Sequence, residues 1–231
     1  MVEILASDSS GIKMTGISIP GSPNDNLCLN AYRLLRDDFN LPPIQIHLHK
    51  IIPTGAGLGG GSSDAAYTLR LLNKLFVLNL SVDQLMKYAT LVGSDCAFFV
   101  QDLPMIGTGR GEVLEPVNLN LKGYYLVLLT PEIHLSTASA YAGVTPAIPP
   151  TGLRALIDEP IARWRDTVKN DFEASIFQRH PAIQALKEKL YLLGALFASM
   201  SGSGSSVFGI FEKEIKTEEC FSDVSGWSGW L

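Results

Sequence analysis

Residues 53–66, with the sequence PTGAGLGGGSSDAA, place five glycines within seven positions and run directly into two serines. Glycine has no Cβ atom, so the backbone N–H groups of such a segment can approach an anion closely. A helix that begins at Ser62 or Ser63 would add its unpaired N–H groups and the positive end of its dipole. These residue types in this order predict a loop that binds the phosphates of a nucleotide.

The sequence on both sides of this loop favours a binding loop over an ordinary tight turn. Before the loop, apolar and polar residues alternate from residue 44 to residue 49, which is the pattern of a half-buried strand. After it, apolar residues recur at helical spacing from residue 65 to residue 76. The expected order is therefore strand, glycine loop and helix.

Three well-known nucleotide motifs do not fit this loop. A P-loop carries a lysine after its last glycine, whereas Gly61 is followed by Ser62. Residues 55–60 do read G-x-G-x-x-G, but Asp83, the acidic residue about 20 positions on, lies in a predicted capping box that begins another helix. Protein kinases also use G-x-G-x-x-G, but the chain has neither H-R-D nor D-F-G.

Length and composition predict a folded protein with a small-molecule ligand. The 231 residues can bury one large core or two modest ones, and 46% of them are hydrophobic. The net charge of −5 makes nucleic acid an unexpected partner. The three cysteines have no C-x-x-C spacing, and the apolar run at 124–130 is too short to span a membrane. We therefore expect a cytoplasmic protein with no membrane partner, and we leave its oligomeric state open.

Several further elements are expected along the chain. Asn24, Asp25 and Asn26 read as the start of a helix that ends near Asn40. The remaining expectations are two helices after the glycine loop, a turn at 107–111, a strand at 124–129, a connector at 146–150, helices at 155–177 and 183–193, and a strand at 207–211.

A second turn of small residues, SGSGSS at 201–206, precedes the last of these strands. Taken alone, it is typical of an ordinary hairpin turn. Together with the first glycine loop, we interpret it as a second segment whose backbone can approach a phosphate or a transferred group.

Asp95 is a single carboxylate within the otherwise apolar segment 92–100. A carboxylate in an apolar cleft could accept or orient the proton of a substrate hydroxyl, or attract a cation. Alternatively, Ser94 or Asp95 could cap a helix by accepting backbone N–H bonds. The spacing does not separate the two interpretations.

Taken in order, residues 53–66, 93–100 and 201–211 resemble the nucleotide loop, catalytic-aspartate segment and C-terminal glycine loop of the GHMP small-molecule kinases. The wording of the first two segments is most similar to the members that act on 4-diphosphocytidyl-2-C-methyl-D-erythritol. Residues 25–27, 107–112 and 170–171 also resemble those members. The resemblance covers most of the chain.

The resemblance implies transfer of a phosphoryl group from ATP, with Mg²⁺, to the 2-hydroxyl of that small-molecule substrate in the non-mevalonate isoprenoid pathway. It implies an α+β fold of two lobes, with a ribosomal protein S5-like N-terminal lobe and a ferredoxin-like C-terminal lobe. We accordingly expect an ATP-binding domain at residues 1–117 and a C-terminal domain at residues 118–231.

The resemblance also assigns roles to individual residues. Asp95 would be the catalytic carboxylate, Asn26 and Leu27 would lie near adenine, and Lys50 would approach the nucleotide. The residues expected to wrap or close over the phosphates are Pro53, Thr54, Gly55, Ala56, Gly57, Leu58, Gly59, Gly60, Gly61, Ser62, Ser63, Gly202, Ser203 and Gly204.

The chain departs from the pattern of these kinases at its beginning. Relatives begin with a segment that carries a lysine in an A-K-I-N-L-like motif and an aromatic–histidine pair for cytidine, whereas residues 1–4 resemble the strand that follows it. Neither Lys13 nor Lys50 occurs in that motif. We therefore expect an N-terminally truncated fold that binds nucleotide but has little kinase activity. A non-catalytic nucleotide-binding homologue, or a kinase for another small alcohol such as mevalonate or homoserine, remains the alternative.

Three smaller expectations concern individual side chains. His47 and His49 share one face of the predicted strand, and we expect solvated strand residues there because no third metal ligand accompanies them. Asp64 would repel bound phosphates unless a cation intervenes, so we expect it near Mg²⁺. Trp227 and Trp230 are expected to pack the last strand.

Overall fold

The structure is a computed structural model that describes residues 1–231, and the chain divides into two compact units. Unit 1 comprises Met1–Thr54 and Gly59–Val117. Unit 2 comprises Gly55–Leu58 and Asn118–Leu231. Four residues of the first glycine loop therefore belong to unit 2, although their neighbours on both sides in the sequence belong to unit 1.

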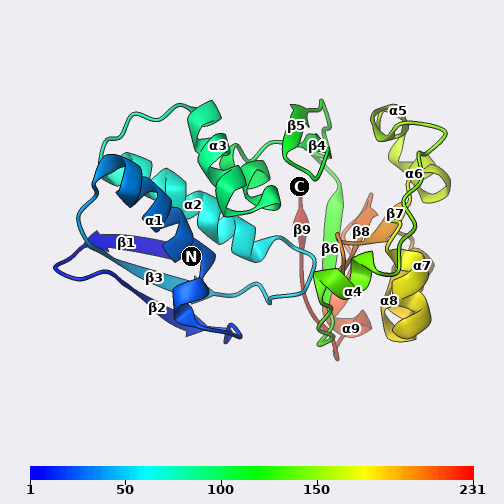
Figure 1. Ribbon diagram of the computed structural model, residues 1–231. Coiled ribbons are helices and arrows are strands. Elements are labelled where there is room, and N and C mark those ends of the chain that lie inside the picture. Colours follow the sequence, from blue (N-terminus) through cyan, green and yellow to red (C-terminus); the bar gives the residue numbers. More distant parts are fainter. The chain divides into compact units, whose positions relative to one another are not determined.

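Unit 1 contains a three-stranded sheet with helices on one of its faces (Figure 1). The strands are β1 (Val2–Ala6), β2 (Gly11–Gly16) and β3 (Ile44–Lys50). Strand β3 lies in the centre, antiparallel to β1 and parallel to β2. Every second residue of β3 is buried, as the alternation in the sequence predicts.

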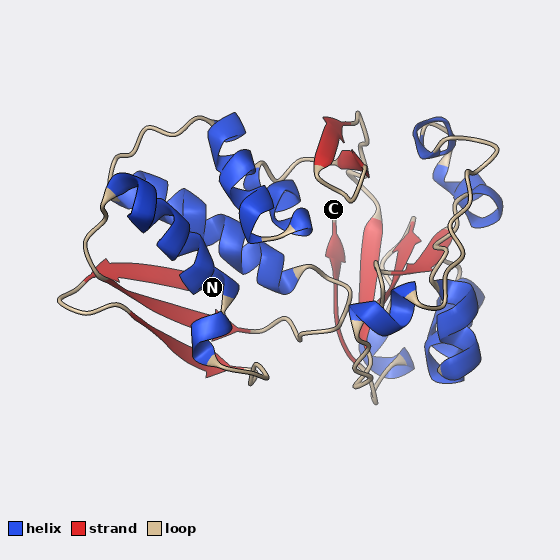
Figure 2. Cartoon of the chain, viewed as in Figure 1, coloured by secondary structure: helices blue, strands red, loops and turns tan.

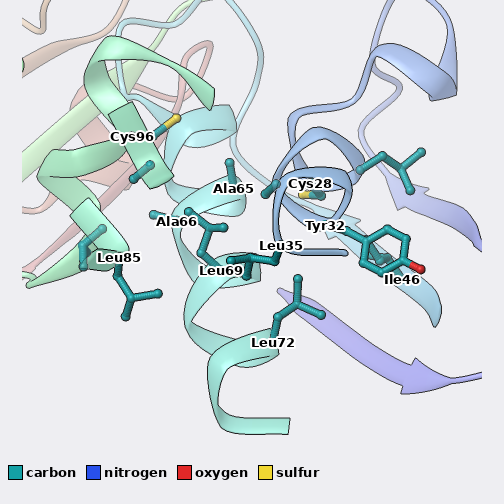
Figure 3. Close-up of a cluster of buried hydrophobic side chains, with 14 of the residues drawn as sticks. Cys28, Tyr32, Leu35, Ile46, Ala65, Ala66, Leu69, Leu72, Leu85 and Cys96 are labelled. Atoms are coloured by element: carbon teal, nitrogen blue, oxygen red, sulfur yellow. The ribbon is translucent and has the colours of Figure 1, made fainter. Parts of the chain in front are cut away.

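The helices of unit 1, apart from the short η1 (Pro23–Asp25), bury their apolar faces against each other and against β3. The others are α1 (Leu27–Phe39), α2 (Gly60–Leu75), α3 (Val82–Val92) and the 3₁₀ helix η2 (Ser94–Val100). Figure 3 shows side chains from α1, α2, α3 and η2 meeting in one core, with Leu35, Leu69 and Leu72 fully buried. The periodic leucines of α2 therefore fix this helix to the core of unit 1.

Local capping chemistry sets the ends of these helices. Asn26 caps α1, because its side-chain oxygen accepts a hydrogen bond from the N–H of Cys28 at 2.9 Å. Asn40 ends the same helix in the left-handed conformation. Ser81 and Gln84 form the predicted capping box at the start of α3. All three expectations are confirmed.

A hairpin completes unit 1. Strands β4 (Met105–Thr108) and β5 (Val113–Pro116) pair antiparallel around the glycine-rich segment predicted as a turn. The turn is shorter than expected, because Gly107 and Thr108 already belong to β4.

Unit 2 is built on a four-stranded antiparallel sheet with the order β7-β8-β6-β9. Its strands are β6 (Tyr125–Thr130), β7 (Phe197–Met200), β8 (Val207–Phe211) and β9 (Ser225–Trp230). The strands expected near residues 124–129 and 207–211 are confirmed as β6 and β8. Trp230 packs edge-on against Tyr125 across β9 and β6, so this tryptophan packs the last strand as expected.

The helix expected at 155–177 is wrong as a single element. The chain forms three short helices there, α5 (Leu153–Ile157), α6 (Ile161–Thr167) and α7 (Glu173–Arg179). Pro160 separates the first two because it has no N–H group to continue the helix. Val168, in an extended conformation, ends α6. Figure 2 shows these breaks as loop between the helices.

The remaining helices of unit 2 are α4 (Thr137–Tyr141), α8 (Pro181–Leu192) and α9 (Thr217–Cys220). The helix predicted at 183–193 corresponds to α8, which packs with α7 against one face of the sheet. Helix α6 packs against the other face, where Trp164 meets Phe197. No helix of the chain combines the length and the apolar character needed to cross a membrane.

The capping box of α3 yields a prediction for stability. Ser81→Ala removes the acceptor for the N–H of Gln84, so we expect it to lower the free energy of unfolding by about 1 kcal/mol. Urea denaturation followed by circular dichroism measures the change. Thr90→Ala, at an exposed site on the same helix, is the control and should change this free energy by no more than about 0.5 kcal/mol. Equal effects of both substitutions would contradict the assignment of Ser81 as the cap.

Candidate functional site

Glycine residues form the junction between the first glycine loop and α2. Helix α2 begins at Gly60, and Gly59 is its N-cap with a φ of +62° and no side-chain hydrogen bond. The expected start at Ser62 or Ser63 is therefore wrong by two to three residues, since glycine reaches the left-handed conformation that turns the chain into the helix. As a result, Gly60, Gly61 and Ser62 all lie in the first turn, whose N–H groups have no acceptor within the helix.

Gly57 lies against the second glycine turn within unit 2. A Cβ atom on Gly57 would lie 2.0 Å from the carbonyl oxygen of Ser201 and 2.8 Å from that of Gly204. Its φ of +72° is also a conformation that other residues rarely adopt. Both the space and the backbone conformation therefore require glycine at this position.

Hydrogen bonds join the same two segments, although 144 residues separate them. Ser201 Oγ donates to the carbonyl oxygen of Gly57 at 2.8 Å. The N–H of Ser206 donates to the carbonyl oxygen of Ala56 at 3.0 Å. The 201–206 segment is a hairpin turn between β7 and β8, and it is also the binding partner of the first loop. The hairpin turn is confirmed, and the approach of its backbone to a phosphate stays a prediction.

Lys50 and Asp64 form an ion pair inside unit 1. The Lys50 side chain at the end of β3 is 3% exposed, and its Nζ lies 2.5 Å from Asp64 Oδ2 in the second turn of α2. A buried charge needs a partner of opposite sign, and this pair meets that need on both sides. The ammonium group of Lys50 is thus one cation beside Asp64, and the expected Mg²⁺ near this carboxylate stays a prediction.

Burial also changes the chemistry of a thiol beside this pair. Burial raises the pKa of the Cys28 thiol from 9.0 to about 11, and Asp64 adds to the rise, while Thr68 and Lys50 oppose it. Burial likewise raises the pKa of Cys96, next to Asp95. Neither thiol is therefore activated as a nucleophile at neutral pH.

Asp95 lies on the surface of unit 1. It is the second residue of η2, and its side chain is exposed. The capping alternative is wrong, because Gly93 is the N-cap of η2 and no side chain caps it. The carboxylate is also not buried in the apolar segment, since the 3₁₀ turn directs Cys96 and Ala97 inward and leaves Asp95 outside. An exposed carboxylate of this kind is accessible to a substrate hydroxyl.

Asn26 and Leu27, expected near adenine, lie at the start of α1. The amide of Asn26 is occupied as the cap of that helix and as a donor to the sulfur of Met14. A hollow of about 80 Å³ lies beside Asn26, lined by Met14, Ile19, Pro20, Gly21, Ser22, Asp25 and Asn26. Ligand pockets usually measure about 300–1,000 Å³, so this hollow by itself does not hold a nucleotide base.

His47 and His49 form a hydrogen-bonded chain across the open face of the unit 1 sheet. Thr15 Oγ1 lies 2.9 Å from His47 Nε2 and 3.0 Å from His49 Nδ1, and His47 Nδ1 bonds to Glu3. No group of three or more His, Cys, Asp or Glu side chains in the chain could hold a metal ion. The two histidines link the three strands of this sheet.

The structure brings together some of the predicted residues. In unit 2, residues 55–58 meet residues 201–206, whereas unit 1 contains Lys50, Asp95 and the start of α2. Sequence reasoning missed Ser201 and Ser206 as the residues that join the two loops. The only signal for them was the density of serines in the second turn.

Gly57→Ala tests the close approach of the two loops. The added Cβ would overlap a backbone carbonyl at a residue with positive φ, so we expect a loss of about 2 kcal/mol or more in stability. Urea denaturation measures this loss. Gly61→Ala is the matched control, because its Cβ would meet only Leu27 Cδ1 at 3.7 Å and an alanine favours the helix. Equal stability of the two variants would contradict the contact.

The pKa of Cys28 predicts how stability changes at alkaline pH. The folded state holds the proton of the Cys28 thiol more tightly than the unfolded state does. The contribution of this thiol to the free energy of unfolding is therefore complete below pH 9 and is lost as the pH rises through about 11. Between pH 8 and pH 10 the wild type should lose about 1 kcal/mol more than Cys28→Ala, measured by urea denaturation at each pH. Cys220→Ala, at a partly exposed thiol, is the control and should follow the wild type. An identical slope for Cys28→Ala would show that this thiol does not titrate in that range.

Two family models match the chain. The model for the GHMP kinases N terminal domain matches residues 26–102, and the model for the GHMP kinases C terminal matches residues 153–225. A protein of Parabacteroides distasonis is 47% identical over 232 residues, covering 100% of this chain and 86% of that protein. A protein of Bacteroides thetaiotaomicron is 50% identical over 199 residues, covering 86% and 73%. Both relatives are named 4-diphosphocytidyl-2-C-methyl-D-erythritol kinase.

Solved structures show the same fold. A crystal structure of 4-(cytidine 5'-diphospho)-2C-methyl-D-erythritol kinase matches with a TM-score of 0.82 and 28% identity, covering 99% of this chain and 84% of that one. Homoserine kinase from Cytophaga hutchinsonii matches with a TM-score of 0.74 at 18% identity, covering 99% and 84%, and so shares the fold alone. The predicted α+β fold of two domains is confirmed, and the chain belongs to the GHMP kinase family.

Proposed function

We propose that this chain is an ATP-dependent kinase that phosphorylates the 2-hydroxyl of 4-diphosphocytidyl-2-C-methyl-D-erythritol, a step of the non-mevalonate isoprenoid pathway. The observation that carries the proposal is the contact of the two glycine loops through Gly57 and Ser201. At this contact the backbones of both loops pack closely, and few side chains would keep a phosphate away from them. The names of the relatives at 47% and 50% identity support this acceptor among the small alcohols.

The triphosphate of ATP fits the first loop for physical reasons. The first turn of α2 offers N–H groups and the positive end of a 16-residue helix to an anion. The proposed phosphate contacts are Pro53, Thr54, Gly55, Ala56, Gly57, Leu58, Gly59, Gly60, Gly61, Ser62 and Ser63, with Gly202, Ser203 and Gly204 of the second turn. Asn26 and Leu27 remain proposed contacts of adenine.

We propose that Lys50 contributes to nucleotide binding without touching the phosphates. Its ammonium group is buried and paired with Asp64, so it would act on the phosphates by cancelling the charge of that carboxylate beside the start of α2. We further propose residues 1–117 as the ATP-binding domain and residues 118–231 as the C-terminal domain.

Mg²⁺ would accompany the nucleotide. The chain has no cluster of three or more acidic, histidine or cysteine side chains that would hold the ion alone. Mg²⁺ in kinases is usually bound by one or two carboxylates together with the phosphates of the substrate, and the exposed Asp95 suits that arrangement. When bound, the ion would neutralise charge on the β- and γ-phosphates.

Asp95 would orient the acceptor hydroxyl and take up its proton. In the reaction, the hydroxyl oxygen forms a bond to the γ-phosphorus while the bond from that phosphorus to the bridging oxygen of ADP breaks. The backbone N–H groups of the loop would hold the transferred group in line and stabilise its charge. The reaction releases ADP and the phosphorylated alcohol.

We propose that the reaction takes place in the cytoplasm. Cys28, Cys96 and Cys220 are all free thiols, and two of them are buried, which suits a reducing compartment.

Asp95→Asn tests the proposed function. We expect acceptor-dependent ADP release, measured by a coupled assay, to fall by about a hundredfold or more, because the amide cannot take up the proton. ATP affinity, measured by calorimetry, should change by less than about threefold, since the fold and the loops are unaltered. Asp83→Asn, at an exposed carboxylate in the first turn of α3, is the matched control and should retain wild-type activity.

The same assay separates the alternatives. ADP release that needs the acceptor and depends on Asp95 supports the kinase. ATP binding without any acceptor-dependent turnover by the wild-type chain would instead support the nucleotide-binding homologue. Full activity of Asp95→Asn would contradict the assigned role of this carboxylate.

A further inference from the structure

A group of polar side chains from α7, α8 and the segment before α7 surrounds the end of β7 in unit 2. Glu173 Oε1 accepts a hydrogen bond from the N–H of Met200 at 2.8 Å and from Ser199 Oγ at 3.2 Å. Glu173 Oε2 accepts from Lys187 Nζ at 2.6 Å. The side chains of Glu173 and Lys187 are only 13% and 22% exposed, so this ion pair is largely removed from water.

Asn170 binds the same free edge of this strand end. Its Nδ2 donates to the carbonyl oxygens of Met200 and Gly202, each at 2.8 Å. Its Oδ1 accepts from the N–H of Phe172 at 3.0 Å, which fixes the orientation of the amide. All three hydrogen bonds of the Asn170 side chain are therefore made to backbone atoms.

These contacts have a clear physical cause. Strand β7 is at the edge of the sheet, so the N–H and carbonyl groups of Met200 that point away from β8 have no strand to pair with. Asn170 and Glu173 satisfy both groups with side chains instead. The backbone is therefore fixed at the residue where the strand gives way to the second glycine turn.

Hydrogen bonds connect this fixed strand end to the first glycine loop. Ser201 follows Met200, and its N–H pairs with Ser206 across the hairpin while its Oγ holds Gly57. Gly202, the next residue, is held by Asn170. A continuous series of hydrogen bonds thus runs from Asn170 and Glu173 through the second turn to Gly57.

We propose that Asn170 and Glu173 are positioning residues for nucleotide binding, which set the 201–206 turn and, through it, residues 55–58. This inference rests on the proposed function, in which those residues contact phosphates. A displacement of about 1 Å in a group that orients a reacting phosphate can cost about a hundredfold in rate, so the position of the turn is consequential. Lys187 balances the charge of Glu173, which would otherwise add a buried negative charge to unit 2.

Nucleotide affinity and hydrogen exchange test the proposal together. Asn170→Ala and Glu173→Ala should weaken binding of a fluorescent ADP analogue by about tenfold or more. In hydrogen–deuterium exchange, both should raise exchange at residues 55–58 and 201–206 by about tenfold, with α8 unchanged. Exchange of the loops needs no activity and reports the position of the backbone directly.

Two further variants keep the result interpretable. Glu173→Gln retains an oxygen acceptor for the N–H of Met200, so it should recover most of the affinity that Glu173→Ala loses. Gln184→Ala, at an exposed site on α8, is the matched control and should behave as the wild type. A merely structural role for Glu173 would lower the melting temperature without changing affinity or exchange in the loops.

The outcomes separate this inference from the proposed function. Unchanged affinity and unchanged loop exchange in both alanine variants would overturn the positioning role. If the wild-type chain bound no nucleotide, the proposed function would fail, and the exchange of residues 55–58 and 201–206 would still decide whether Asn170 and Glu173 position the loops.

Discussion

The candidate site depends on one steric constraint, the absence of a side chain at Gly57. Only without a Cβ can the backbone at this position come close enough for Ser201 and Ser206 to bind the carbonyl groups of Gly57 and Ala56. Those two carbonyls point toward the second turn and are satisfied there. A phosphate requires N–H groups and is repelled by carbonyl oxygens, so directing these carbonyls into the protein leaves the loop with the polarity that an anion needs.

The ion pair of Lys50 and Asp64 cancels a negative charge near the start of α2 in unit 1. A carboxylate in the second turn of α2 would repel an anion bound at the start of this helix, where we propose that phosphate binds. Pairing it with a lysine at the end of the adjacent strand cancels the charge locally and leaves the helix dipole effective. Burying two charges has a desolvation cost, and a hydrophobic pair of similar volume would often be no less stable. The pair is therefore better explained by the electrostatics of the helix start than by stability.

The sequence predicts local features of this chain well and distant contacts poorly. Asn26, Ser81 and the alternation of β3 are all readable because a cap or a strand depends on residues within a few positions. The start of α2 was misplaced because a glycine N-cap gives no side-chain signal. Strand β7 was missed since four consecutive buried residues have no period to distinguish strand from helix. The meeting of Gly57 with Ser201 involves residues 144 positions apart, and no local pattern encodes it.

The same reasoning explains why the glycine loops do not choose the acceptor. Backbone N–H groups recognise a phosphate by charge and distance, and they are the same whatever alcohol receives the phosphoryl group. Discrimination between alcohols needs side chains that meet the rest of the acceptor, and a shared fold does not supply them. The proposed acceptor therefore rests on similarity along nearly the whole chain. The proposed phosphate contacts rest on the resemblance of the two glycine loops to those of the family, and the hydrogen bond of Ser201 to Gly57 adds to that support. Because the hydrogen bonds of Asn170 and Glu173 to Met200 and Gly202 involve no acceptor alcohol, an error in the assigned acceptor would leave their positioning role intact.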